Sequence, residues 1–192
     1  MPNQILQENL ASIAFGVAAS FNPVDDGTNF TDDLITIDYA LTAGAPTLNG
    51  AARQSIKADL GTPRAPKYAL YAAVDFTGET PTATGKVDYY WAPSTNATQA
   101  NGNIAGNSGA DAACPDGALG SITLAEFLEQ CIPIGSLKTH DGASVQNGFV
   151  GYLLPPTQWG QLIEVNNSGD AFEADDVEHH AVLVPIVDEV QG

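Results

Sequence analysis

Residues 67–76 read KYALYAAVDF, and this stretch decides the fold class. Apolar side chains occupy every second position, which is the pattern of a β-strand with one buried face. The residues expected to share that face are Tyr68, Leu70, Ala72, Val74 and Phe76. The same alternation recurs at 34–42 (LITIDYALT) and at 86–92 (KVDYYWA), so half-buried strands are expected there as well.

Strand and turn signals continue through the rest of the chain. Further strands are expected at 11–20, 51–59, 132–138, 145–154, 160–166 and 178–190. Turn dipeptides such as Asn49-Gly50 and Asp141-Gly142 separate the runs, at a spacing typical of a sandwich or barrel. We therefore predict a single all-β domain over residues 1–192, an antiparallel, jelly-roll-like β-sandwich. Residues 1–21 are expected to form either its first strand or an N-terminal arm.

One short helix interrupts the β pattern. Thr123 and Glu126 have the spacing of a capping box, which marks the start of a helix. The apolar stripe behind them consists of Leu124, Phe127 and Leu128. The helix is expected to end near Cys131 and to lie across one open end of the sheets.

A long loop is expected at residues 93–118, which read APSTNATQANGNIAGNSGADAACPDG. Loops of this length are uncommon inside compact domains and are either functional or disordered. A packed loop or a contact with a neighbouring subunit would each hold it in place.

The charge balance is strongly acidic, with 6 Lys+Arg against 23 Asp+Glu and a net charge of −17. Such a chain repels phosphate backbones and anionic bilayers, so neither nucleic acid nor a membrane is expected as a partner. Four of the six cations fall within residues 53–67, and they are Arg53, Lys57, Arg64 and Lys67. This cluster has two interpretations: a surface that docks on a partner's acidic patch, or internal pairing with the chain's own acids.

The motifs of common catalytic sites are missing from the sequence. There is no G-x-S-x-G nucleophile elbow, and His179 and His180 are consecutive in an expected strand, so they point to opposite faces. Paired acids such as Asp25/Asp26 lie in turn-like stretches, where caps and solvated loops are the common outcome. We predict no enzyme activity, no catalytic residue, no cofactor and no metal site. The oxygen-rich segments 25–33 and 173–180 are the alternatives for a structural calcium site.

The two cysteines, Cys114 and Cys131, lack the spacing of a zinc site. A reduced pair in a protein synthesised in the cytoplasm is expected, with a disulfide as the alternative. The aromatic residues also have two interpretations, either core packing or a platform for stacking sugars. The residues concerned are Tyr89, Tyr90, Trp91, Tyr152 and Trp159.

Four segments resemble small structural proteins of tailed bacteriophages. They are AARQSIKADLG (51–61), VDYYWAPS (87–94), GNSGADAA (106–113) and HAVLVPIVDE (180–189). The resemblance implies a capsid decoration, or cement, protein that binds the outer capsid at capsomer junctions and stabilises the head. It also implies a homotrimer, the major capsid protein as partner, and the virion surface as location. The alternative is a tail or fibre-associated module that contacts host-surface glycans through its aromatic residues.

Overall fold

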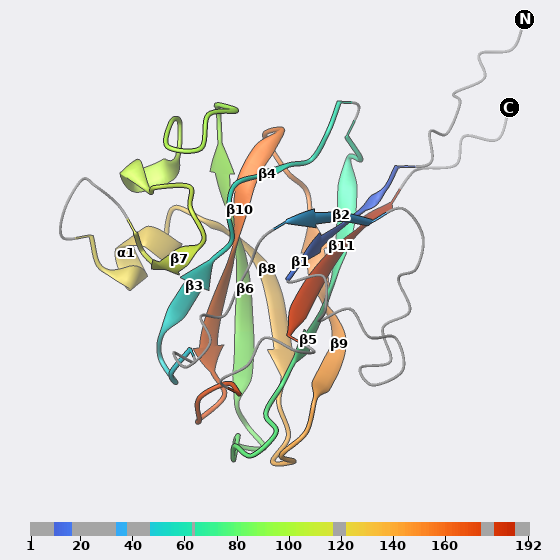
Figure 1. Ribbon diagram of the computed structural model, residues 1–192, viewed down its shortest axis with the longest axis vertical. Helices are drawn as coiled ribbons and strands as arrows, with labels where there is room; N and C mark the ends of the chain where they lie inside the picture. Colours follow the sequence, from blue (N-terminus) through green and yellow to red (C-terminus); the bar gives the residue numbers. More distant parts are fainter. Residues whose placement is uncertain are drawn as a thin grey trace, which may run out of the picture.

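The computed structural model describes residues 10–16, 34–37, 47–62, 64–116, 122–173 and 179–186 (Figure 1). These residues form eleven strands, one α-helix and one 3-10 turn. The strands are β1 (Ser12–Phe15), β2 (Leu34–Ile37), β3 (Ala52–Gln54), β4 (Ala58–Asp59), β5 (Lys67–Val74), β6 (Lys86–Ser94), β7 (Ala112–Cys114), β8 (Ile132–Lys138), β9 (Gln146–Leu153), β10 (Trp159–Asn167) and β11 (His180–Ile186). The helical elements are η2 (Ile104–Gly106) and α1 (Leu124–Leu128).

The strands belong to one hydrogen-bonded sheet in the order β2-β1-β11-β5-β9-β8-β6-β10-β3-β7, with β4 paired to β10. Every pair is antiparallel except β1 and β2, which are parallel. The predicted all-β, antiparallel fold with one short helix is confirmed. Two separate sandwich sheets are not confirmed, because pairing continues along the whole path, and the jelly-roll order stays a prediction.

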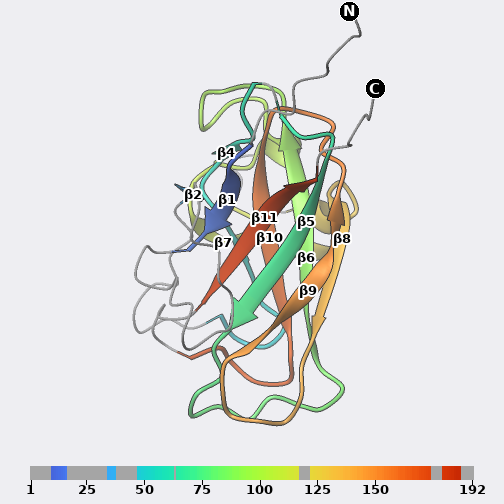
Figure 2. The same ribbon diagram turned by 90° about the vertical axis from the view of Figure 1, so that its right-hand side faces the viewer.

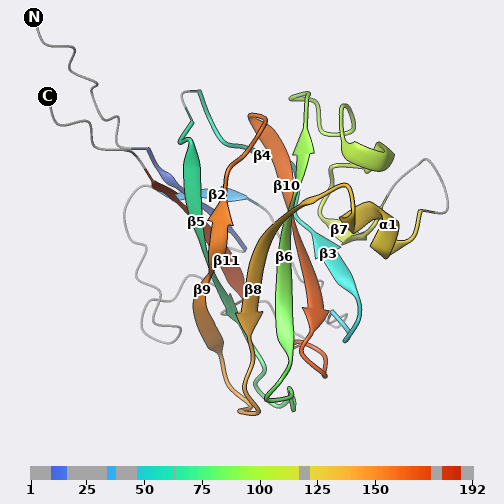
Figure 3. The ribbon, with the colours of Figure 1, turned by 180° about the vertical axis from the view of Figure 1, so that it is seen from behind.

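The sheet turns a corner between β8 and β9, which pair only at Gly135 and Gly151. A Cβ atom at Gly151 would lie 2.1 Å from the Ile134 carbonyl oxygen, so only glycine allows this approach. The corner divides the sheet into a first half (β2, β1, β11, β5, β9) and a second half (β8, β6, β10, β3, β7, with β4). Seen from the side and from behind, the sheet curls so that β11 and β5 lie across from β10 and β6 (Figures 2 and 3).

The main core fills the space between the two half-sheets. The ring of Phe15 on β1 packs edge-on against Trp91 on β6, with centroids 6.5 Å apart. Phe76 and Phe172 form a similar pair at 5.6 Å. The predicted inward faces are confirmed, because all of these residues are buried in one cluster: Tyr68, Leu70, Ala72, Val74, Phe76, Val87, Tyr89 and Trp91.

Helix α1 covers the outer face of the second half-sheet. Its predicted capping box is confirmed: Thr123 Oγ1 accepts from the Glu126 amide, and the Glu126 side chain accepts from the Thr123 amide at 2.8 Å. Phe127 is fully buried in a second apolar cluster with Ile163 and Val165 of β10. The expected position across an open end of the sheets was therefore wrong, because the apolar outer face of β10 is what this helix buries.

Two other expectations change in detail. Residues 51–59 form two short strands rather than one, and β7 and η2 lie inside the expected loop 93–118. A proline within a strand predicts an edge position or a bulge. Pro185 nevertheless lies in β11, which is flanked by β1 and β5. The proline is tolerated because β1 pairs only with residues 181–183, so no partner in β1 needs a hydrogen bond from position 185.

Candidate interaction surface

Exposed large apolar side chains concentrate at strand β9. Phe149, Tyr152 and Leu154 are 47%, 50% and 64% exposed, and the fourth such residue in the described part of the chain is Leu48, in the turn before β3. Contiguous exposed apolar groups of this kind mark interaction sites in soluble proteins. The group is called the aromatic surface below and comprises Lys67, Tyr71, Phe149, Tyr152 and Leu154.

The rings of the aromatic surface hold one another in place. Phe149 lies edge-to-face against Tyr71 at 5.6 Å and against Tyr152 at 5.0 Å, both with an interplanar angle of 62°. The Lys67 ammonium sits over the Tyr152 ring, 3.7 Å from its centroid. Aromatic pairs contribute about 0.5–1.5 kcal/mol beyond their buried area. The side chains are therefore ordered before any partner binds, which lowers the entropic cost of binding.

A β-bulge in β9 places these rings on one face. Leu70 of β5 pairs with Gly151, but the next residue, Tyr71, pairs with Phe149, so Val150 is the extra residue. Val150 points into the main core. Because of this extra residue, Phe149 and Tyr152, three positions apart, both face outward; in a regular strand they would lie on opposite faces.

The first half-sheet carries no carboxylate in its strands. Their sequences are SIAF, LITI, HAVLVPI, KYALYAAV and QNGFVGYL, in a chain with 23 Asp+Glu. Lys67 is the single Lys or Arg among them. The second half-sheet, in contrast, includes Asp59, Asp88 and Glu164 in its strands. Among the described residues, the aromatic surface thus combines exposed apolar side chains with one lysine and no acid.

The four clustered cations make contacts within the chain and do not gather into one cationic patch. Arg53 forms an ion pair with Asp111, at 2.8 Å between Nη2 and Oδ1. Arg64 donates to the carbonyl oxygens of Pro155 and Pro156, each at 3.4 Å. Lys67 lies over the Tyr152 ring, as described above. Among the described residues, Arg53 is therefore the one cation of the four that pairs with an acid, as the second interpretation expected. The docking role stays a prediction.

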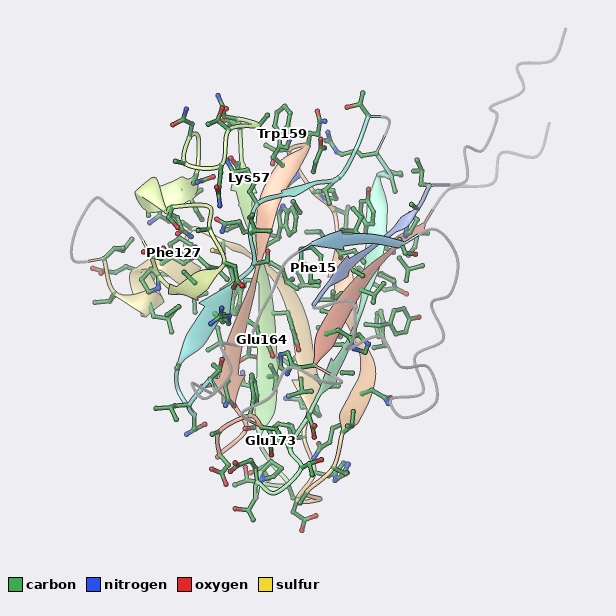
Figure 4. All side chains as sticks on the ribbon, in the orientation of Figure 1. Phe15, Lys57, Phe127, Trp159, Glu164 and Glu173 are labelled. Carbon is green, nitrogen blue, oxygen red and sulfur yellow. The ribbon has the colours of Figure 1, made fainter. Side chains whose placement is uncertain are left out.

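Lys57 fastens the loop that follows β6 (Figure 4). Its ammonium donates to the backbone carbonyls of Asn96, Thr98 and Asn101 at 3.0, 2.7 and 2.7 Å. The Lys57 amide also donates to the Gly109 carbonyl at 2.9 Å. Partial burial lowers the pKa of Lys57. The long loop is thus packed onto the domain by contacts within the chain.

Sequence reasoning missed a buried polar cluster inside the main core. Glu164 of β10, labelled in Figure 4, lies inside the domain. Its carboxylate accepts from the Tyr89 hydroxyl at 3.2 Å and lies 3.1 Å from His179 Nε2. The Glu164 and His179 side chains are each 1% exposed, and burial raises the pKa of Tyr89. The sequence feature that could have indicated this cluster is Glu164 itself, an acidic residue inside the apolar run of β10. This cluster joins β10 to the start of β11, and no substrate reaches it without opening the core.

The five aromatic residues considered for a sugar-stacking platform do not assemble into one, and core packing holds for Tyr89 and Trp91. Tyr89 and Trp91 are buried in the main core, whereas Tyr90 packs against the second apolar cluster, on the other face of β6. Trp159 is partly buried at the start of β10. Of the five residues considered, only Tyr152 belongs to the aromatic surface. Its neighbours Tyr71 and Phe149 were not predicted, because the β-bulge that places them on one face cannot be recognised from the alternation of apolar and polar residues along β9.

Both cysteines are free and buried, which confirms the reduced pair. Burial raises the pKa of Cys131 to about 12, and burial likewise raises the pKa of Cys114. Neither thiol is therefore a nucleophile at neutral pH.

Two further features concern metals and membranes. Within the ranges that the structure describes, no three His, Cys, Asp or Glu residues gather as metal ligands would. The segment 25–33 and most of 173–180 lie outside those ranges. No described helix combines the length and apolar character of a bilayer span.

Fold and surface together describe an all-β protein with an ordered, exposed aromatic surface. In comparisons with known proteins, no family model, no curated protein and no solved structure matches the chain. Its function is accordingly inferred from its own residues.

Proposed function

We propose that this protein is a non-enzymatic structural component of a tailed-phage virion. It acts as a capsid decoration protein, binds the outer capsid at capsomer junctions and stabilises the head. The major capsid protein is its partner, and it sits on the particle as a homotrimer. The resemblance of the four segments quoted above supports this proposal.

The observation that carries the proposal is the aromatic surface. Aromatic residues are enriched in the buried centres of protein interfaces, while Asp and Glu are depleted there. Phe149, Tyr152 and Leu154 have this composition, and the strands of their half-sheet have no acid. A surface of this kind serves adhesion between proteins.

Stabilisation of the head follows from mass action. A protein that binds the assembled lattice but not its separate subunits favours the assembled state, by an amount that grows with its concentration. The chain contributes a rigid scaffold for this purpose, since the loop after β6 is fastened by Lys57 and the corner at Gly135 and Gly151 is closely packed.

The test uses heads of the encoding phage that lack this protein. The purified full-length chain is added back, bound copies are counted by quantitative mass spectrometry, and DNA release on heating is followed by dye fluorescence. We expect saturation at hundreds of copies and release at a higher temperature. Saturation at a handful of copies, or release at an unchanged temperature, would overturn the proposal.

A second candidate function is glycan binding by a tail or fibre-associated module. The half-exposed Tyr152 ring favours it, because sugars stack on accessible aromatic faces. However, Phe149 and Tyr152 meet at 62°, so they do not form one flat platform. Binding on a glycan array that is lost in Tyr152→Ala would support this function, and an array with no bound glycan would exclude it.

A further inference from the structure

We infer that the occupant of the aromatic surface is a second copy of this chain. The inference deepens the proposed function and rests on it only for the lattice that holds neighbouring copies close together. The aromatic surface then joins neighbouring copies side by side on the lattice, and it contributes to decoration through these contacts between copies.

Charge is the first argument for self-association here. Two copies, each with a net charge of −17, repel one another wherever carboxylates would meet. The exposed acids of the described residues lie on other segments, and they are Asp59, Asp116, Glu126, Glu129 and Asp141. The strands of the first half-sheet carry none. Among the described residues, contact through this half therefore brings the fewest carboxylates together.

Lys67 adds to this argument. Its ammonium is engaged with the Tyr152 ring, and no ion pair joins it to any described carboxylate. Because this ammonium is already held over the Tyr152 ring, it needs no acidic partner across the contact. Among the described residues the aromatic surface contains no acid, so two copies can meet there without apposing any described carboxylates.

The size of the surface sets the strength of the contact. Phe149, Tyr152 and Leu154 are about half exposed. Large side chains of this kind bury 150–250 Å² when fully covered, so each offers about 100 Å², or about 300 Å² per copy. A standard stable interface buries about 800 Å² per partner. Association in free solution is therefore weak, and a lattice that raises the local concentration makes it effective.

The experiment is sedimentation velocity on the full chain, from about 10 μM to about 1 mM, the range in which such weak contacts are populated. We expect the weight-average sedimentation coefficient to rise with concentration. The rise should be larger in about 0.5 M than in about 0.02 M NaCl, because salt screens the repulsion between acidic copies.

Two substitutions locate the contact. Leu154→Glu introduces a carboxylate at a residue that is 64% exposed and should weaken self-association at least tenfold without disturbing the fold. Leu48→Glu is the matched control, since Leu48 is 62% exposed but lies in the turn before β3, and it should associate like the parent. Thermal melts of both variants confirm folding.

Three outcomes would overturn the inference. They are a monomer at every concentration and salt, association that weakens as salt is raised, and Leu154→Glu associating as strongly as Leu48→Glu. Titration onto heads that lack the protein separates this inference from the proposed function. The parent chain should fill heads cooperatively and Leu154→Glu without cooperativity. If neither binds heads, the decoration role fails while the sedimentation result stands.

Discussion

Asp88 illustrates, at the scale of one residue, how this acidic protein accommodates a buried charge. Ser136 donates to one carboxylate oxygen, while Asn167 and Lys86 contact the other, each at 2.9 Å. Burial by itself raises the pKa of Asp88, but the hydrogen bonds from Ser136, Lys86 and Asn167 together hold it below its ordinary value. The charged form is therefore favoured by folding.

This pKa shift has a definite sign for stability. Because the folded-state pKa of Asp88 lies below the unfolded value, the carboxylate stabilises the fold above the unfolded pKa, and the contribution is lost as pH falls through the folded pKa. We expect Asp88→Asn to lower the free energy of unfolding by about 1–3 kcal/mol at neutral pH, where hydrogen bonds to a charged group are lost. The difference from the parent should shrink towards the acid limit.

Urea denaturation of both proteins at neutral and acidic pH measures this difference. Asp141→Asn, at an exposed loop position, is the matched control and should behave like the parent at both values. The prediction would be contradicted if Asp88→Asn lowered the free energy of unfolding by the same amount at both pH values.

Lys57 is the second residue whose role is decided by its contacts. Its ammonium donates hydrogen bonds to three backbone carbonyls, which belong to Asn96, Thr98 and Asn101. Without the ammonium, these carbonyls would depend on water for hydrogen bonds. We expect Lys57→Met to leave the global fold intact and to cost about 1–2 kcal/mol. Amide hydrogen exchange in residues 95–102 should accelerate, because local opening of the loop becomes easier.

Hydrogen exchange followed by mass spectrometry, with peptides covering this loop and strand β6, measures the effect. Lys138→Met is the control, since Lys138 is an exposed lysine at the end of β8. Equal exchange in the loop for the parent and Lys57→Met would show that the three contacts do not order it.

At the scale of the elements, two departures from regular β geometry shape the surface. The bulge in β9 turns Phe149 and Tyr152 to the same side, and the corner at Gly135 and Gly151 lets the sheet curl around its core. Neither is visible in the alternation of side chains, because a bulge is defined by the partner strand and a corner by the close approach of two backbones.

The corner predicts a strong dependence on glycine. An alanine at position 151 would place its Cβ 2.1 Å from the Ile134 carbonyl oxygen, and a backbone atom cannot move aside cheaply. We expect Gly151→Ala to cost about 3 kcal/mol or more in unfolding free energy. Gly148→Ala on the same strand is the control: its Cβ meets only the flexible end of Leu137, at 3.3 Å.

Chemical denaturation of the two variants gives the comparison directly. A small, similar loss in both would mean that β8 and β9 separate without cost, and that the corner does not hold the two half-sheets together.

For the whole molecule, the net charge of −17 is the dominant property. Self-repulsion destabilises a compact acidic chain, and salt screens it: the Debye length falls from about 30 Å at 0.01 M to about 10 Å at 0.1 M. We therefore expect the melting temperature of the dilute protein to rise by several degrees between these concentrations.

Differential scanning fluorimetry at micromolar concentration, where copies do not associate, measures this shift. Sucrose at equal osmolality is the control for non-ionic effects on stability. A melting temperature that falls with added NaCl would show that attractive ion pairs, such as Arg53 with Asp111, outweigh the general repulsion.

The sequence by itself determined the secondary structure and the core of this protein. Alternation at 67–76 and 86–92 identified the strands and their buried faces, because every second side chain of a half-buried strand faces the core and is apolar. The capping box likewise identified helix α1, since its partners are three residues apart. These signals lie within short segments, so they can be interpreted without knowing which other segments pack against them.

Only the tertiary structure decided the curled sheet, the partners of the clustered cations and the aromatic surface. The Lys57 ammonium reaches carbonyls that lie 39 to 44 residues away along the chain, and the Glu164 carboxylate meets a hydroxyl 75 residues away. Phe149 and Tyr152 share a face because β5 imposes a bulge on β9. Contacts between distant segments depend on strand register and backbone approach, and neither is encoded in the periodicity of a single strand.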